Sequence, residues 1–144
     1  MPSSAFWAFG TILQLGDGAT PEVFTAIAEV VDFDPPSMSK DSIDVTNRGT
    51  STNQFKEAIP GLKDGGSVSF KCNWLPTNST HDGTTGIVKV FKDNVNHNWK
   101  CILPDAIKTI AFTGHVTAYT PETPMAAQGS FSATIKVSGE PTGW

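Results

Sequence analysis

The sequence has few charged residues, and cations are the scarcer kind. Only 17% of the 144 residues are charged, with 10 Lys and Arg against 14 Asp and Glu, which gives a formal net charge of −4. A protein that binds the phosphates of a nucleic acid needs clustered cations and is normally basic. The composition therefore argues against such a binder, although it allows DNA to pass nearby without being held.

Cysteine is also scarce, since only Cys72 and Cys101 are present. A secreted scaffold built on disulfides would contain more cysteines in a chain of this length. Both cysteines fall on apolar faces of expected strands, so we expect buried thiols that act as small hydrophobic groups. A disulfide would be geometrically feasible if their strands were adjacent, but a reducing compartment argues against it.

Long hydrophobic runs are missing. The start of the chain, residues 1–7, has no basic segment followed by a sustained apolar stretch, so we expect no signal peptide. No run approaches the length of a transmembrane helix. We therefore expect a soluble chain that is made in a reducing cytoplasm and does not insert into a membrane.

Glycine and proline, in contrast, are abundant, with 13 and 10 residues. Residues that interrupt regular structure this often favour many short strands over long helices. Apolar and polar side chains alternate with a period of two, which predicts half-buried strands. These strands cover 8–15, 39–46, 67–75, 98–103, 108–119 and 130–138. We expect a single mainly β domain over residues 1–144, an antiparallel β-sandwich of about eight strands.

The segment 22–33 reads as a strand with two apolar faces. It follows a tight turn at Gly16-Asp17-Gly18, where glycine permits the positive φ that a hairpin needs. One face is a candidate for contact with another subunit, and its members are Phe24, Ala26, Ala28 and Val30. The alternative is a central strand with a helix over it, and both interpretations remain open.

A long connection between strands, about 47–66, is the most unusual part of the chain. Its first half, 47–54, contains no apolar residue, whereas the second half carries Phe55, Ile59 and Leu62. Connections of this length are uncommon in compact domains and are usually functional or mobile. We expect a flexible arm with an apolar anchor that holds copies of the chain together, with Arg48 pairing an acid across the joint. The alternative is a surface loop whose Phe55 and Leu62 pack on their own core.

One helix is expected at about 84–94. Ile87, Val88 and Phe91 fit a helical stripe, and Asp82 or Thr84 is placed to cap its start. Gly86 and the β-branched residues weaken this helix.

No residue pattern predicts catalysis or a cofactor. No histidine sits in a nucleophile-bearing motif, and no ligands show metal-binding spacing. We expect the histidines to be satisfied surface residues; they are His81, His97 and His115. The acids around Pro35-Pro36 read as solvated turn residues; they are Asp32, Asp34, Asp41 and Asp44. We therefore expect a protein that is not an enzyme and that has no metal or other cofactor.

Four tryptophans leave a binding alternative open. A β-sandwich with exposed tryptophans can present a platform for sugars, so a carbohydrate-binding module is the first competing function. Trp74 and Trp99 are in register with core residues, whereas Trp7 and Trp144 lie near the ends of the chain.

The order of these features resembles a known family. The hairpin at Gly16-Asp17-Gly18 leads into Phe24-Thr25-Ala26-Ile27-Ala28-Glu29-Val30 and Pro35-Pro36. Then come Ile43-Asp44-Val45-Thr46, the polar segment, and Ile59-Pro60-Gly61-Leu62-Lys63-Asp64-Gly65-Gly66. A strand ending Trp74-Leu75-Pro76, one helix and three strands follow. From about residue 10 to 139, this order resembles the major tail tube protein of long-tailed, non-contractile bacteriophages of the lambda type.

The resemblance implies a specific role. Such proteins form hexameric rings that stack into a tube around the tape measure protein. Tail tip or terminator proteins lie at the ends of the tube. DNA later passes through the bore without sequence-specific binding. The arm reaches toward neighbouring subunits and rings. The expected location is the virion tail, after a stage in the host cytoplasm. The tube of type VI secretion shares this fold, so a protein of that machine is a second alternative.

Overall fold

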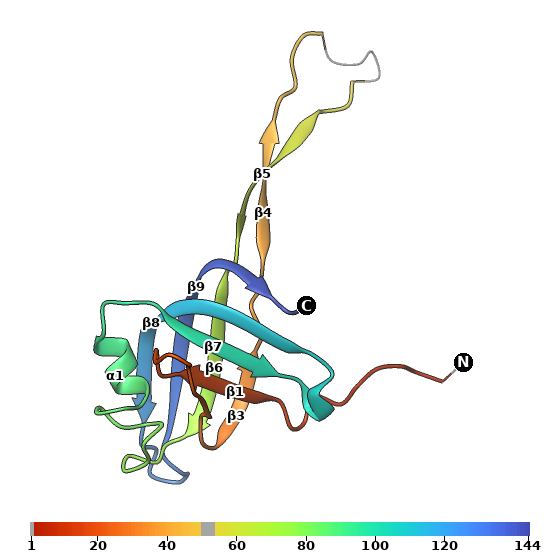
Figure 1. Ribbon diagram of the computed structural model, residues 1–144. Coiled ribbons are helices and arrows are strands. Elements are labelled where there is room, and N and C mark those ends of the chain that lie inside the picture. Colours follow the sequence, from red (N-terminus) through yellow and green to blue (C-terminus); the bar gives the residue numbers. More distant parts are fainter. Residues whose placement is uncertain (1, 50–53) are drawn as a thin grey trace.

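A computed structural model describes residues 2–49 and 54–144 (Figure 1). The described residues form nine strands, one α-helix and one 3-10 turn. Their bounds are β1 Ile12–Gly16, β2 Phe24–Ala26, β3 Val30–Asp34, β4 Ser39–Asp44, β5 Ala58–Asp64, β6 Ser67–Asn73, α1 Ile87–Lys92, β7 His97–Ile102, η1 Pro104–Ala106, β8 Thr109–Glu122 and β9 Ser130–Thr142. Every strand pairing is antiparallel. The predicted mainly β, antiparallel fold with one helix is confirmed.

Seven of the strands form one continuous sheet, in the order β2-β1-β7-β8-β9-β6-β3. The two longest strands, β8 and β9, pair in its middle. The sheet curls, so that β1 near one end contacts β3 at the other. The two layers of the sandwich are therefore halves of a single hydrogen-bonded sheet that face each other across one core.

The core is built from the apolar positions of the alternating strands. Trp99 of β7 and Phe131 of β9 are completely buried, and Phe131 meets Phe70 edge-to-face with ring centroids 6.2 Å apart. Side chains from both halves of the sheet join one buried cluster, whose partly buried members include Leu15 of β1 and Phe33 of β3. The period-two patterns at 67–75 and 130–138 thus identified the core-facing residues correctly.

The predicted single strand at 22–33 is wrong, because the chain turns sharply in its middle. Phe24 and Ala26 lie on β2 at one end of the sheet, whereas Val30 lies on β3 at the other. Ala28 lies in the turn between them, and Glu29 there has a φ of 52°, in the left-handed region. The four residues of the expected contact face therefore do not share a strand. The apolar pattern on both faces comes from two strands that contact the core from different ends.

A buried histidine holds this turn, contrary to the prediction of a surface residue. His81 is 1% exposed. Its Nε2 lies 2.8 Å from the carbonyl oxygen of Ala28, and its Nδ1 accepts the N–H of Leu75 at 3.1 Å. The Thr80 hydroxyl accepts the N–H of Ala28 at 3.1 Å. Because Nδ1 must accept, the ring is neutral with its hydrogen on Nε2.

The helix is shorter than predicted. The Asp82 carboxylate accepts the backbone N–H groups of Thr84, Thr85 and Gly86, so the expected cap holds a turn just before the helix rather than its first residue. α1 then runs only from Ile87 to Lys92 and buries Ile87 and Val90. Phe91, which was expected on the helical stripe, is 44% exposed.

The two cysteines are buried and free, as predicted. Cys72 lies on β6 and Cys101 on β7, and β8 and β9 separate these strands in the sheet. Burial raises the pKa of the Cys72 thiol to about 12 and that of the Cys101 thiol to about 11. Since the thiolate is the reactive form, both side chains behave as inert hydrophobic groups at neutral pH.

Candidate assembly interface

Among the described residues, strands β4 and β5 pair only with each other, and they project from the body as a two-stranded ribbon (Figure 1). The observed ribbon differs from the predicted arm in two ways. The projection begins at Ser39 rather than near residue 47, and its second half contains a strand, β5, instead of a loop. Residues 50–53, which belong to the predicted polar reach, lie outside the described residues.

One face of the ribbon carries a row of apolar side chains. Ile43 lies opposite Ile59, and the next position on the same face carries Val45, whose N–H donates to the carbonyl oxygen of Glu57 at 3.0 Å. We call Ile43, Val45 and Ile59 the apolar ribbon face. These side chains are 48%, 38% and 49% exposed. The register places the opposite face with Ser42 beside Pro60 and Asp44 beside Ala58.

A bulge near the base bends the ribbon. The register shifts between Lys40 and Ser42, so that Gly61 and Leu62 together oppose one residue, Asp41. A Cβ on Gly61 would lie 3.0 Å from the Cβ of Asp41, so a side chain here would crowd the partner strand. Pro60 and this bulge break the period-two pattern, which explains why the sequence did not indicate β5.

All four residues predicted for the arm lie on the ribbon or its tip. Phe55 and Leu62 are 75% and 83% exposed, which excludes the alternative in which they pack on their own core. Ile59 lies on the apolar ribbon face, and Arg48 is exposed near the tip. Sequence reasoning missed Ile43 and Val45, although the alternation at 39–46 was itself the available signal.

The base of the ribbon is tied to the sheet through Asp64. Lys136 of β9 places its ammonium nitrogen 2.8 Å from the Asp64 carboxylate and 3.3 Å from the carbonyl oxygen of Gly66. The same carboxylate accepts the Gly66 N–H at 2.9 Å. Hydrogen bonding from Lys136, followed by that from the Gly66 amide, lowers the pKa of Asp64 below its ordinary value. These contacts fix the direction in which the ribbon leaves the body.

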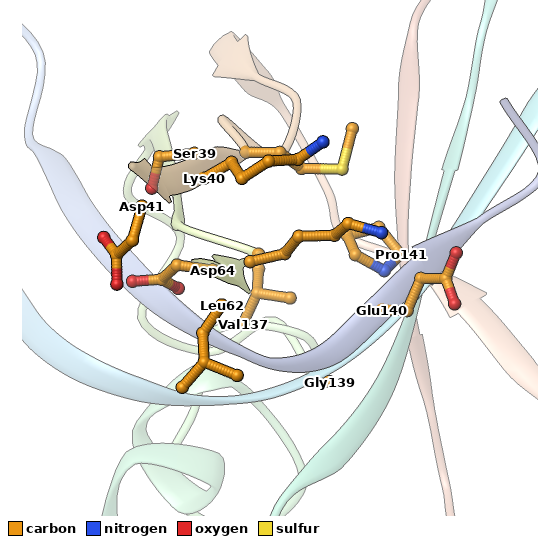
Figure 2. Close-up of a pocket in the computed structure, with 12 residues that line it drawn as sticks. Ser39, Lys40, Asp41, Leu62, Asp64, Val137, Gly139, Glu140 and Pro141 are labelled. Carbon is orange, nitrogen blue, oxygen red and sulfur yellow. The ribbon is translucent and has the colours of Figure 1, made fainter. Parts of the chain in front are cut away.

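An open pocket of about 780 Å³ lies at this base (Figure 2). Leu62 and Val137 contribute apolar side chains, and Lys40 extends along the opposite side. The carboxylates of Asp41 and Asp64 lie together at one end of the view, and Pro141 and Glu140 lie at the other. The full lining is Met38, Ser39, Lys40, Asp41, Leu62, Lys63, Asp64, Gly65, Val137, Gly139, Glu140 and Pro141.

Other chemistry is sparse. Among residues 2–49 and 54–144, no group of three or more His, Cys, Asp or Glu side chains is arranged to hold a metal ion. Within the same ranges no helix is both long and apolar enough to cross a bilayer. The tryptophans are dispersed: Trp99 is fully buried and Trp74 packs against the core, while Trp7 and Trp144 are exposed.

Solved structures similar to this chain include chains of gene transfer agent particles, of a phage tail tube and of extracellular contractile injection systems. A chain in the virion of a native gene transfer agent particle has a TM-score of 0.76 at 15% identity, covering 97% of this chain and 99% of that one. A chain in the C6-symmetric tail of an empty gene transfer agent particle has a TM-score of 0.71 at 17% identity, covering 92% and 95%. The SPP1 tail tube has a TM-score of 0.66 at 10% identity, covering 93% and 77%. No curated protein matches the sequence significantly.

The chain thus has the fold found in these tail structures. The sequence is more specific, because the model of the lambda phage tail tube protein family matches residues 9–143, nearly the whole chain. This chain belongs to the lambda phage tail tube protein family. Its role is structural: it is a building block of a virion tail tube.

Proposed function

We propose that this chain polymerises as hexameric rings that stack into a phage tail tube, the conduit through which the genome enters the host. The apolar ribbon face carries the proposal, because it projects into solvent and no second layer formed by residues 2–49 or 54–144 covers it. A two-stranded ribbon is at best marginally stable alone in water. A neighbouring copy that covers Ile43, Val45 and Ile59 would bury this face.

Rings suit the geometry of the ribbon. A segment that projects from one copy onto a different surface of the next makes a heterologous contact, which closes into a ring or continues as a stack. The C6 symmetry of the gene transfer agent tail with the same fold supports six copies. In this proposal Phe55, Ile59 and Leu62 bury between copies, and Arg48 pairs an acid of a neighbour.

Partners follow from the tube. We expect it to assemble around a tape measure protein and to end at tail tip or terminator proteins. Before assembly the chain resides in the host cytoplasm. The net charge of −4 supports passage of DNA without sequence-specific binding, since few cations are available to hold phosphates. We expect no enzymatic activity.

Two adjacent substitutions on opposite ribbon faces test the proposal. Ile43→Asp places a charge on the apolar ribbon face, and Ser42→Asp places the same charge on the opposite face. Both residues are exposed, so either change should alter folding free energy by only about 0.5 kcal/mol. In electron micrographs of concentrated protein, we expect tubes with Ser42→Asp and none with Ile43→Asp. Equal tube formation by both variants would contradict the role of this face.

A further inference from the structure

A second unsatisfied apolar feature lies before β1. The rings of Trp7 and Phe9 stack on each other with centroids 5.0 Å apart, yet the two residues remain 80% and 76% exposed. With Phe6, which is 52% exposed, they form the aromatic segment, residues 6–9. Large aromatic side chains dominate interface energetics, and a cluster of three on one exposed segment indicates a binding element.

The local backbone directs this segment away from its own body. The N–H and the hydroxyl of Thr11 both donate to the carbonyl oxygen of Ala8, at 3.3 and 2.7 Å. Gly10, inside this turn, has a φ of 95°, which other residues rarely adopt. Figure 1 shows the chain running outward from the sheet before this turn. The aromatic segment therefore projects from the sheet into solvent.

The pocket at the ribbon base has matching chemistry. Its volume of about 780 Å³ falls in the range of roughly 300–1,000 Å³ typical of binding pockets. Met38, Leu62 and Val137 offer apolar contact, and the thioether of Met38 suits an aromatic edge. Lys40 and Lys63 can lie over aromatic faces. The carboxylates that line the pocket provide acceptors for the indole N–H of Trp7.

We infer that the aromatic segment of one copy docks in the ribbon-base pocket of another copy. The inference rests on the proposed function, because it assigns one of the contacts that join copies. Segment and pocket belong to every copy and lie on different surfaces, so each copy can give and receive this contact. Such a heterologous contact repeats along an assembly. It also places a neighbour's segment against Leu62 and Asp64, where the direction of the ribbon is set.

Directed cross-linking in the full-length chain tests the inference. Phe9→Cys and Met38→Cys, carried on chains with different tags, are mixed at concentrations that allow assembly and then oxidised. The native Cys72 and Cys101 are buried and do not compete. Phe9→Cys mixed with Met125→Cys is the control, because Met125 is fully exposed and does not line the pocket. We expect the Phe9–Met38 pair to cross-link between chains at least about tenfold faster than the control, because docking raises the local thiol concentration.

Three outcomes are decisive. Preferential cross-linking between differently tagged chains supports the inference. A double variant, Phe9→Cys with Met38→Cys, that closes only within one chain would overturn it, because the segment would then occupy its own pocket. Cross-linking no faster than the control would also overturn it. Electron microscopy of the same samples keeps the two proposals apart: tubes without the cross-link would leave the proposed function standing, and the cross-link without tubes would remove that function alone.

Discussion

Lys136 and Asp64, 72 residues apart in sequence, join the base of the ribbon to the middle of the sheet through a 2.8 Å ion pair. Both side chains are substantially exposed, at 40% and 57%, so the pair contributes little to global stability. Its effect is local. It holds the carboxylate where that group also accepts the Gly66 N–H, and so fixes the turn from which the ribbon departs.

The pH dependence of this turn follows from the lowered pKa of Asp64. Its ordinary value is 3.8, and the hydrogen bond from Lys136 is the largest cause of the decrease. A carboxyl group whose pKa is lowered on folding stabilises the fold above its unfolded pKa, and this contribution disappears as pH falls through the folded pKa. We expect the Gly66 amide NMR shift to titrate with a midpoint below 3.8. A midpoint at or above 3.8 would contradict the contact, and Lys136→Met should raise the midpoint.

The turn at Gly66 should not tolerate a side chain. Gly66 and Gly18 share a φ of 76°, so alanine is strained by about 1–2 kcal/mol at either position. A Cβ at Gly66 would also fall onto the carbonyl oxygen of Ser37, whereas at Gly18 nothing lies within 4 Å. We therefore expect Gly66→Ala to lower the free energy of unfolding by roughly 1–3 kcal/mol more than Gly18→Ala does. Urea unfolding of the two variants measures the difference, and equal losses would be inconsistent with the close approach.

Removing the His81 ring should be costly. His81→Ala leaves the Leu75 N–H and the Ala28 carbonyl without their partners and opens a space beside Phe131, whose ring centroid lies 4.9 Å away. We expect a loss of about 2–5 kcal/mol in unfolding free energy. His115→Ala is the matched control, since His115 is exposed, and it should change stability by only about 0.5 kcal/mol. Similar losses in both variants would refute the structural role of His81.

The two cysteine thiols should be unreactive in the folded protein. With pKa values raised by burial to about 12 and about 11, neither thiol ionises appreciably at pH 8. A thiol-specific chromogenic reagent should label neither residue in native buffer and both in denaturant. Rapid labelling of the native chain would show that the body of the sheet opens more easily than its packing indicates.

The sequence predicted the regular part of the fold well, because strict alternation is a local signal. Residues 67–75 and 130–138 became β6 and β9 with the expected faces inward. The prediction from sequence failed where tertiary contacts determine the path of the backbone. The turn at Glu29 depends on hydrogen bonds that join Ala28 to Thr80 and His81, about 50 residues later, and no local pattern in the sequence indicates them.

The candidate interface was half predictable for the same reason. The apolar anchors Phe55, Ile59 and Leu62 were visible as unexplained hydrophobic residues in a polar region. Their strand was not visible, because Pro60 and the bulge at Gly61 interrupt the period of two. The apolar ribbon face appears only when β4 and β5 are paired, since Ile43 and Ile59 lie 16 positions apart and meet across the ribbon.

Cryo-electron microscopy of the concentrated full-length chain measures the central claim most directly. We predict stacked rings of six copies in which Ile43, Val45 and Ile59 of each ribbon are covered by a neighbouring copy. A structure in which this face remains in solvent within the assembly, or a concentrated protein that forms no rings or tubes, would contradict it.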